Sequence, residues 1–152
     1  MIDLNNFDIG FKKVSHNLNY NWDWMILKNL LASSEEKYYR DLGNGGFTLG
    51  NLQTHEYCST VVSFLQKQKS DYYARAGLYV STKENSITFP YHKDDGQYLW
   101  IWQIIGDTVW QVDGFSFTLY QNEVLYISPG LYHQAIPNKP RASITFSLEQ
   151  FK

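Results

Sequence analysis

The chain has 152 residues, a formal net charge of -2 and one cysteine, Cys58. This length favours a single domain over residues 1–152. The near-neutral charge argues against a general nucleic-acid binder, and a lone cysteine excludes an internal disulfide.

No signal peptide is visible in the first residues, Met1-Ile2-Asp3-Leu4-Asn5. The N-terminus lacks the basic region and the apolar run of a signal peptide. No apolar stretch approaches the ~20 residues that span a bilayer. We therefore expect a cytoplasmic protein with neither membrane nor nucleic-acid partners.

The first half of the chain, residues 1–73, is predicted to be mostly helical. Apolar side chains recur at helical spacing from Trp22 or Asp23 to about Ala32, and again over residues 52–69. A short strand could precede the helices, because apolar residues alternate weakly at Phe7, Ile9, Phe11 and Val14.

A glycine-rich segment, residues 41–50, separates the two predicted helices. Its string Gly43-Asn44-Gly45-Gly46 lacks the following lysine and the preceding apolar strand of a phosphate-binding loop. The composition predicts a mobile loop, which could serve as a lid.

From Ala74 onward the sequence is typical of short strands. Asp113-Gly114 is the strongest hairpin signal in the chain. Turn residues recur at the spacing of a closed or double-sheet β architecture. Because helices precede strands, the fold class is α+β or mainly β, with the β core in residues 74–150. About eight strands are predicted, over residues 78–82, 87–89, 98–105, 108–112, 115–120, 123–127, 131–136 and 142–148.

Three residues of this β region could bind one metal ion. His92 and Asp94 are two positions apart, so on a strand they share a face. His133 follows Pro129-Gly130 at the start of another predicted strand, which could return to the same mouth of a barrel. Two imidazoles and a carboxylate form the donor set of non-haem iron(II) sites. The alternative is a structural hydrogen bond between histidine and aspartate.

The surrounding strings resemble the JmjC-type, cupin-like family of iron(II)- and 2-oxoglutarate-dependent oxygenases. The resemblance covers about residues 77–150, and Pro129-Gly130-Leu131-Tyr132-His133 is its most specific element. The other strings are Phe89-Pro90-Tyr91-His92-Lys93-Asp94, Gln103-Ile104-Ile105-Gly106-Asp107-Thr108-Val109-Trp110 and Ala142-Ser143-Ile144-Thr145-Phe146-Ser147-Leu148. The family fold is a double-stranded β-helix, a jelly roll of two four-stranded sheets, and N-terminal helices usually brace one sheet.

The resemblance implies a mechanism and a set of site residues. His92, Asp94 and His133 would form the facial triad around Fe(II), with 2-oxoglutarate chelating the metal. The expected reaction consumes O2, releases succinate and hydroxylates a C–H bond of an amino acid, a peptide or protein side chain, or a small natural product. Asp94 favours hydroxylation, because related halogenases lack this carboxylate.

The distal carboxylate of 2-oxoglutarate requires a cation, and a guanidinium fits it through two parallel hydrogen bonds. Arg141 and Ser143 have the spacing of this anchor in many 2-oxoglutarate oxygenases outside the JmjC group. The lysine usual in the JmjC group is absent after Gly106. The alternative for Arg141 is a solvated residue in a turn. Additional candidate donors to the cosubstrate are Thr88, Tyr98 and Tyr79.

Three other interpretations remain open from the sequence. The protein could be a metal-dependent cupin enzyme that does not use 2-oxoglutarate, which the missing lysine favours. It could be a cupin that binds a ligand without catalysis. The apolar helix over residues 23–32 could also pack against a second copy and form a homodimer.

Overall fold

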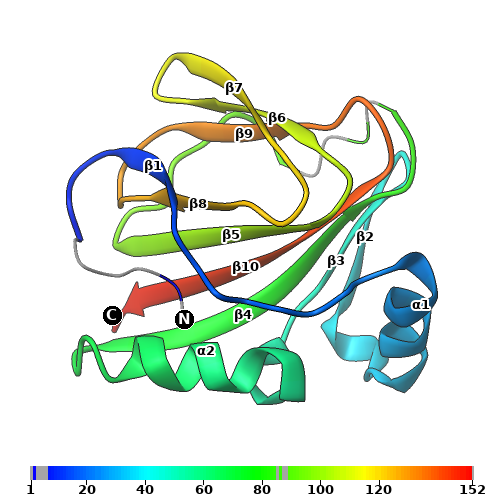
Figure 1. Cartoon of the computed structure of the whole chain (residues 1–152), viewed down its shortest axis with the longest axis horizontal. Helices are drawn as coiled ribbons and strands as arrows, with labels where there is room; N and C mark the ends of the chain where they lie inside the picture. The colour runs from blue at the N-terminus through cyan, green and yellow to red at the C-terminus, as the bar shows by residue number, and fades with distance from the viewer. Residues whose placement is uncertain (1, 3–6, 85, 87–88, 152) are drawn as a thin grey trace.

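Two antiparallel β-sheets form the body of the protein (Figure 1), as shown by a computed structural model that describes residues 2, 7–84, 86 and 89–151. The larger sheet contains β1 (Phe11–Val14), β2 (Tyr39–Gly43), β3 (Gly46–Leu49), β4 (Tyr72–Ser81), β5 (Gln97–Ile105), β8 (Val124–Ile127) and β10 (Arg141–Gln150), in the order β1-β8-β5-β10-β4-β3-β2. The smaller contains β6 (Thr108–Val112), β7 (Phe115–Leu119) and β9 (His133–Ile136), in the order β7-β6-β9. The mainly β, two-sheet fold is the predicted one.

The central strand β10 explains why the larger sheet has two different faces. Successive side chains of a strand point to opposite faces. The apolar residues of β10 lie in the hydrophobic core; they are Ala142, Ile144, Phe146 and Leu148. The polar residues between them face a cavity between the sheets; they are Arg141, Ser143, Thr145, Ser147 and Glu149. One strand therefore holds the helices on one side and lines a polar cavity on the other.

The helices α1 (Trp24–Ser33) and α2 (Glu56–Gln66) confirm the two predicted helical stretches. The Asp23 carboxylate accepts a hydrogen bond from the Ile26 amide at 2.8 Å and caps α1. His55, which the sequence left without a role, caps α2 by accepting from the Tyr57 amide through Nδ1 at 3.4 Å. Short 3-10 turns lie at Glu36–Tyr38 and Leu52–Thr54. None of the helices in the described residues has the length and apolarity needed to cross a membrane.

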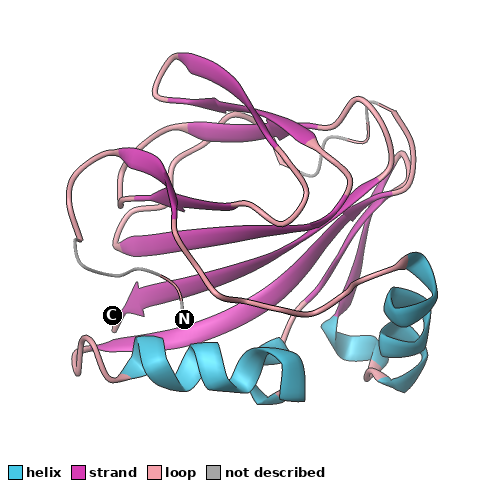
Figure 2. Ribbon diagram, viewed as in Figure 1, coloured by secondary structure: helices cyan, strands magenta, loops and turns pink. Residues whose placement is uncertain are grey.

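Both helices lie on the side of the larger sheet away from the smaller one (Figure 2). Leu27 and Leu30 of α1 and Leu65 of α2 are buried in the same core as the apolar side chains of β10. Burial of this apolar surface is the main force that holds the helices on the sheet.

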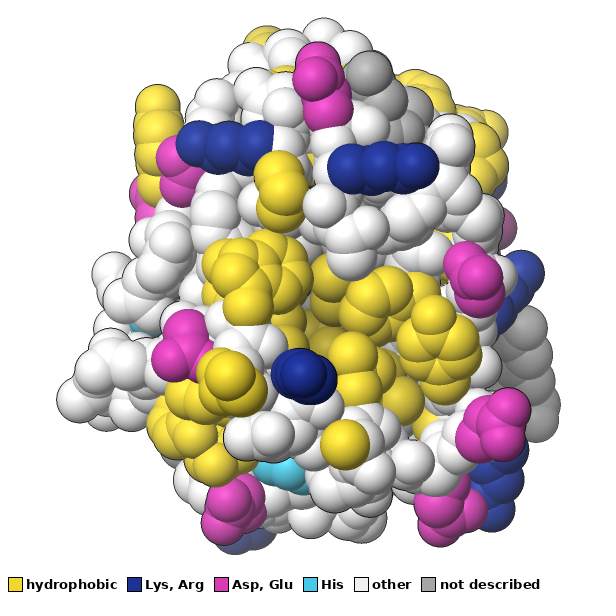
Figure 3. Space-filling view, turned by 90° about the vertical axis from the view of Figure 1, so that its right-hand side faces the viewer, with side chains coloured by type: hydrophobic (Ala, Val, Ile, Leu, Met, Phe, Trp, Pro, Cys, Tyr) yellow, Lys and Arg dark blue, Asp and Glu magenta, His cyan; other side chains and the backbone are white. Residues whose placement is uncertain are grey.

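The outer side of α1 is not covered by the chain. Trp24 and Met25 are 43% and 63% exposed. On the face that carries α1, hydrophobic side chains gather near the centre with a Lys or Arg side chain among them, and most charged side chains lie further out (Figure 3). Packing of this helix against a second copy stays a prediction, which gel filtration would test.

Residues 41–50 form most of a β-hairpin, so the prediction of a mobile loop and lid is wrong. Asn44 and Gly45 occupy the turn with φ values of 53° and 80°, the backbone of a type I′ turn. β2 pairs with β3, and β3 pairs with β4. The hairpin thus extends the larger sheet, and residues 1–73 are less helical than predicted.

Most predicted strands of the second half are confirmed within a few residues. Val112 pairs with Phe115 across Asp113-Gly114, so this hairpin is also confirmed. The predicted strand over residues 87–89 lies largely outside the described residues.

Gly106 connects β5 to β6 and packs against the residue before Arg141. Its φ is +69°, and a Cβ atom there would lie 2.8 Å from the Pro140 carbonyl oxygen. Gly114 has a similar φ of +83° but nothing within 4 Å of a Cβ position. We expect Gly114→Ala to cost about 1 kcal/mol from backbone strain alone. Gly106→Ala should cost about 2–4 kcal/mol, because a steric clash is added.

Urea denaturation of the two alanine variants measures this difference in unfolding free energy. Equal destabilisation of both variants would show that a Cβ atom at position 106 causes no steric clash with the Pro140 carbonyl oxygen.

Candidate metal centre and cavity

The side chains of His92, Asp94 and His133 converge on one point. The Oδ2 atom of Asp94 lies 3.2 Å from Nε2 of His133 and 3.5 Å from Nε2 of His92. One ligand atom from each residue lies within 4.8 Å of the other two. The structure thus brings together the three residues that the sequence pattern singled out.

A backbone bridge, not a regular strand, places the two imidazoles side by side. The His92 amide donates to the His133 carbonyl at 3.1 Å, and the His133 amide donates to the His92 carbonyl at 2.7 Å. His133 itself begins β9 and pairs with Val112 of β6. Asp94 lies in the irregular segment before β5, where its carbonyl accepts from the Gly130 amide at 3.1 Å. The expected strand geometry of residues 92–94 is therefore absent, although the side chains still meet.

Each imidazole ring is oriented by a hydrogen bond of the same kind, from Nδ1 to the backbone carbonyl two residues earlier. Nδ1 of His92 lies 2.7 Å from the Pro90 carbonyl oxygen, and Nδ1 of His133 lies 2.9 Å from that of Leu131. A carbonyl oxygen only accepts, so each Nδ1 must carry a proton and donate it. In the neutral imidazole this leaves the Nε2 lone pair facing Asp94. Metal-binding histidines are commonly held this way, so the donor set fits a divalent cation.

Asp94 provides an anionic oxygen at the point where the Nε2 atoms of His92 and His133 converge. When the imidazoles are protonated, a hydrogen bond from Nε2 of His133 lowers the pKa of this carboxyl, as do the charges of His133 and His92, while partial burial opposes them. The carboxylate is therefore ionised at neutral pH. The neighbouring Asp95 has a side chain that is 76% exposed, with Oδ1 3.7 Å from the amine of Lys93, and does not join the group.

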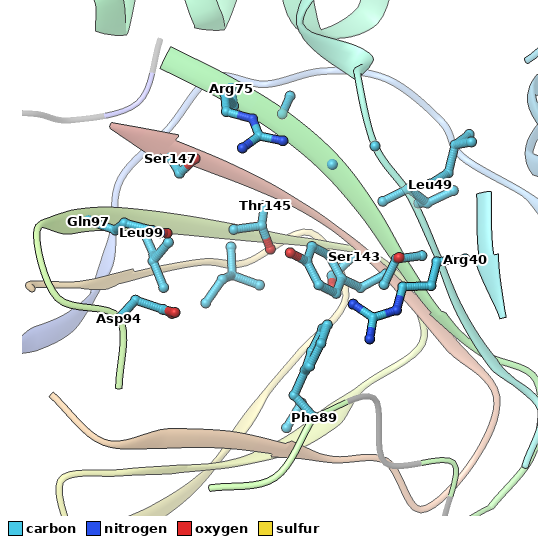
Figure 4. A pocket seen from close by; sticks show the side chains of 18 of the residues that line it. Arg40, Leu49, Arg75, Phe89, Asp94, Gln97, Leu99, Ser143, Thr145 and Ser147 are labelled. Atoms are coloured by element: carbon cyan, nitrogen blue, oxygen red, sulfur yellow. The ribbon is translucent and has the colours of Figure 1, made fainter. Parts of the chain in front are cut away.

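The three side chains face a cavity of about 680 Å³ between the sheets. This volume is within the range of small-molecule sites. Figure 4 shows Asp94 on one side of the cavity and Arg40 on the other, with Phe89 below the space between them. Trp110 and Ala135 of the smaller sheet also line it.

Arg141 and Ser143 lie inside this cavity on β10. Each is 1% exposed, so the alternative of a solvated Arg141 in a turn is wrong. Arg141 donates from Nε to Ser81 Oγ at 3.1 Å and from a terminal nitrogen to Ser143 Oγ at 3.0 Å. Burial lowers the pKa of the guanidinium to about 10, and the charge of Tyr79 opposes this. Arg141 thus remains a cation at neutral pH.

Tyr98 points away from the cavity. Gln97 and Leu99 of β5 line it, so alternation places Tyr98 on the opposite face. Its ring lies 5.1 Å from that of Phe7 and 5.8 Å from that of Tyr72. The predicted contact between Tyr98 and a cosubstrate is therefore wrong. The sequence alone did not fix the register of this strand, and a shift of one residue exchanges its two faces.

Of the other candidate donors, Thr88 lies outside the described residues. Tyr79 lines the cavity. Burial raises the pKa of its phenol, and the negative charge of Asp94 acts in the same direction. Tyr79 therefore keeps its proton and can donate a hydrogen bond to an anion.

Sequence reasoning missed two arginines of the cavity, Arg40 and Arg75. Arg75 lies 3.4 Å from the carboxylate of Glu149, which also accepts from Tyr73 at 3.3 Å and from Ser147 at 3.1 Å. An Asn-Gly hairpin signal at residues 44–45 could have revealed β2 and hence the position of Arg40.

No protein-family model and no curated protein sequence matches the chain. Solved structures match at low identity. The Escherichia coli ribosomal oxygenase YcfD, in complex with cobalt and succinic acid, matches with a TM-score of 0.62 and 15% identity, over 79% of this chain and 35% of YcfD. KdgF from a Halomonas species matches with a TM-score of 0.54 and 10% identity, over 75% of this chain and 86% of KdgF.

An RmlC-like cupin from Shewanella frigidimarina matches with a TM-score of 0.53 and 13% identity, over 78% of this chain and 90% of that protein. These likenesses show that the chain has the cupin fold. The chain spans 35% of the length of YcfD but most of the length of the two smaller proteins.

Proposed function

We propose that the protein is an iron(II)- and 2-oxoglutarate-dependent oxygenase that hydroxylates a C–H bond of an amino acid, a peptide or protein side chain, or a small natural product. The observation that carries this proposal is that His92, Asp94 and His133 line the same cavity as the buried pair Arg141 and Ser143. A metal site and a buried guanidinium in one cavity suit an acid that chelates a metal at one end and carries a carboxylate at the other. YcfD, which shares the fold, was also solved with cobalt and 2-oxoglutarate.

The three triad residues would hold the metal in defined ways. His92 and His133 would bind through Nε2, while the hydrogen bonds from Nδ1 to Pro90 and Leu131 keep the rings oriented. Asp94 would supply a carboxylate oxygen. Iron(II) and 2-oxoglutarate, when bound, supply the oxidising chemistry that places one oxygen atom of O2 in a C–H bond, with release of succinate and CO2.

Arg141 would bind the distal carboxylate of 2-oxoglutarate. Its hydrogen bonds to Ser81 and Ser143 fix the guanidinium on β10 before the ligand enters. A preorganised group loses less conformational entropy on binding than a mobile one. The apolar lining near the triad, which includes Leu99 and Trp110, strengthens electrostatic interactions by lowering the local dielectric.

Calorimetry under anaerobic conditions tests this function, with Mn(II) as a metal that does not support turnover. We expect one Mn(II) to bind per chain, and 2-oxoglutarate to bind the metal-loaded protein but not the metal-free protein. Failure of 2-oxoglutarate to bind the metal-loaded protein, or equal binding in the absence of metal, would contradict the proposal.

A second candidate is a metal-dependent cupin enzyme that does not use 2-oxoglutarate. The chain covers 86% of KdgF and 90% of the RmlC-like cupin, against 35% of YcfD. The sequence Gly106-Asp107-Thr108 also lacks the lysine expected by the JmjC resemblance. Tight binding of Mn(II) without any binding of 2-oxoglutarate would favour this candidate.

A further inference from the structure

Arg40 faces the cavity from the edge strand β2. It pairs with Thr48 on β3, Thr48 pairs with Tyr79 on β4, and Tyr79 pairs with Ser143 on β10. Paired residues of neighbouring strands point to the same face of a sheet. This row of four residues therefore runs across one wall, and all four line the cavity. Figure 4 shows the Arg40 guanidinium pointing from β2 into the space above Phe89.

Two other cations around the mouth of the cavity, Arg75 and Lys37, have partners of opposite charge. The guanidinium of Arg75 lies 3.4 Å from Glu149, and the amine of Lys37 lies 3.1 Å from Glu35. The Asp94 carboxylate contacts the two triad histidines. The Arg40 side chain makes no ion pair with any residue that the structure describes. Its charge is therefore available to a ligand.

Arg40 and Arg141 occupy different depths of the cavity. Arg141 is 1% exposed, whereas Arg40 is exposed to solvent. Their strands are three ladder steps apart, through β4 and β3, which is about 14 Å between the backbones. An acid held by Arg141 thus leaves the Arg40 guanidinium facing a molecule that enters afterwards.

We propose that Arg40 binds a carboxylate of the primary substrate, and hence that the substrate is a small molecule with a free carboxylate, such as an amino acid or its N-acyl derivative. A guanidinium forms two parallel, charge-assisted hydrogen bonds with a carboxylate. Thr48 lies beside it in the ladder, with a hydroxyl as an additional donor. This inference rests on the proposed oxygenase function and names the substrate class of the same site.

Matched pairs of small ligands test the inference. A panel of N-acetyl amino acids and the corresponding N-acetyl amino-acid amides is added to protein loaded with Mn(II) and 2-oxoglutarate, and binding is measured by thermal shift and then by calorimetry. The members of each pair differ only in the carboxylate. We expect at least one acid to bind about 10-fold or more tightly than its amide, as loss of a charge-assisted pair predicts.

Two variants assign that preference to a residue. Arg40→Gln should remove the preference for acid over amide and leave the affinity for 2-oxoglutarate within about 3-fold of the wild type, since Arg141 binds the cosubstrate. Lys12→Gln is the matched control: it removes one exposed positive charge from β1, the other edge strand of the same sheet, and should keep the preference.

The outcomes separate this inference from the proposed function. Absence of 2-oxoglutarate binding to the Mn(II)-loaded wild type would reject the function itself. With 2-oxoglutarate bound, a panel without any preferred acid, or a preference that survives in Arg40→Gln, overturns the role of Arg40 alone. Loss of 2-oxoglutarate binding in Arg40→Gln also overturns it, because the effect of Arg40 would then not be confined to the primary substrate.

Discussion

Replacing Asp94 with alanine should lower the affinity for Mn(II) or Fe(II) by more than about 100-fold. Removing a group that only hydrogen-bonds to a metal ligand already lowers the affinity by up to about 100-fold, and loss of the ligand itself should cost more. The reason is that Asp94 brings the only carboxylate among the three converging ligands. His92→Ala and His133→Ala should have effects of similar size, because each removes one Nε2 donor from the same point. Anaerobic calorimetry measures all three affinities.

Asp95→Ala is the matched control for this prediction. It removes a carboxylate from the next position in the chain, but this side chain is 76% exposed and pairs with Lys93. The control should bind metal as the wild type does, and circular dichroism would verify that every variant is folded. Equal loss of affinity in Asp94→Ala and Asp95→Ala would show that the metal responds to local negative charge and not to coordination by the triad.

Replacing Arg141 with glutamine should weaken binding of 2-oxoglutarate by about 100-fold or more while the affinity for Mn(II) is unchanged. Two hydrogen bonds between charged groups are lost, each with a net contribution of about 1.5–3 kcal/mol. Glutamine can still bond with the hydroxyls of Ser81 and Ser143, which now contact the guanidinium. Calorimetry on the Mn(II)-loaded variants gives both affinities.

Arg40→Gln again provides the comparison, because it removes the same charged group from the edge strand of the same cavity wall. Normal binding of 2-oxoglutarate to Arg141→Gln would exclude Arg141 as its anchor. Equal weakening by the two substitutions would indicate a general effect of positive charge in the cavity, and neither arginine could then be assigned to the cosubstrate.

The two tight hairpins show what the sequence could and could not predict. Asp113-Gly114 and Asn44-Gly45 carry the same turn signal, and both adopt positive φ at both turn positions. The first lies between strongly alternating strands and was predicted correctly. The second lies among additional glycines, whose composition masked the short strands on either side. Missing β2 also meant missing Arg40, since its position depends on that strand.

The convergence of the triad could be predicted from residue types and from the resemblance, but its structural cause could not. The imidazoles are aligned by two backbone hydrogen bonds between His92 and His133, which join positions far apart in the chain. For Tyr98, the sequence-based prediction chose the wrong face of the strand. The face of a strand residue depends on register, and nothing local to Tyr98 fixes the register of β5.

A crystal structure of the Mn(II)-loaded protein, with an anomalous difference map at the metal absorption edge, tests the metal site most directly. We expect one peak about 2.0–2.3 Å from Nε2 of His92, Nε2 of His133 and a carboxylate oxygen of Asp94, the usual range for nitrogen and oxygen ligands of first-row metals. A well-occupied peak bound by other residues, or no peak at these three side chains in metal-saturated crystals, would contradict the account.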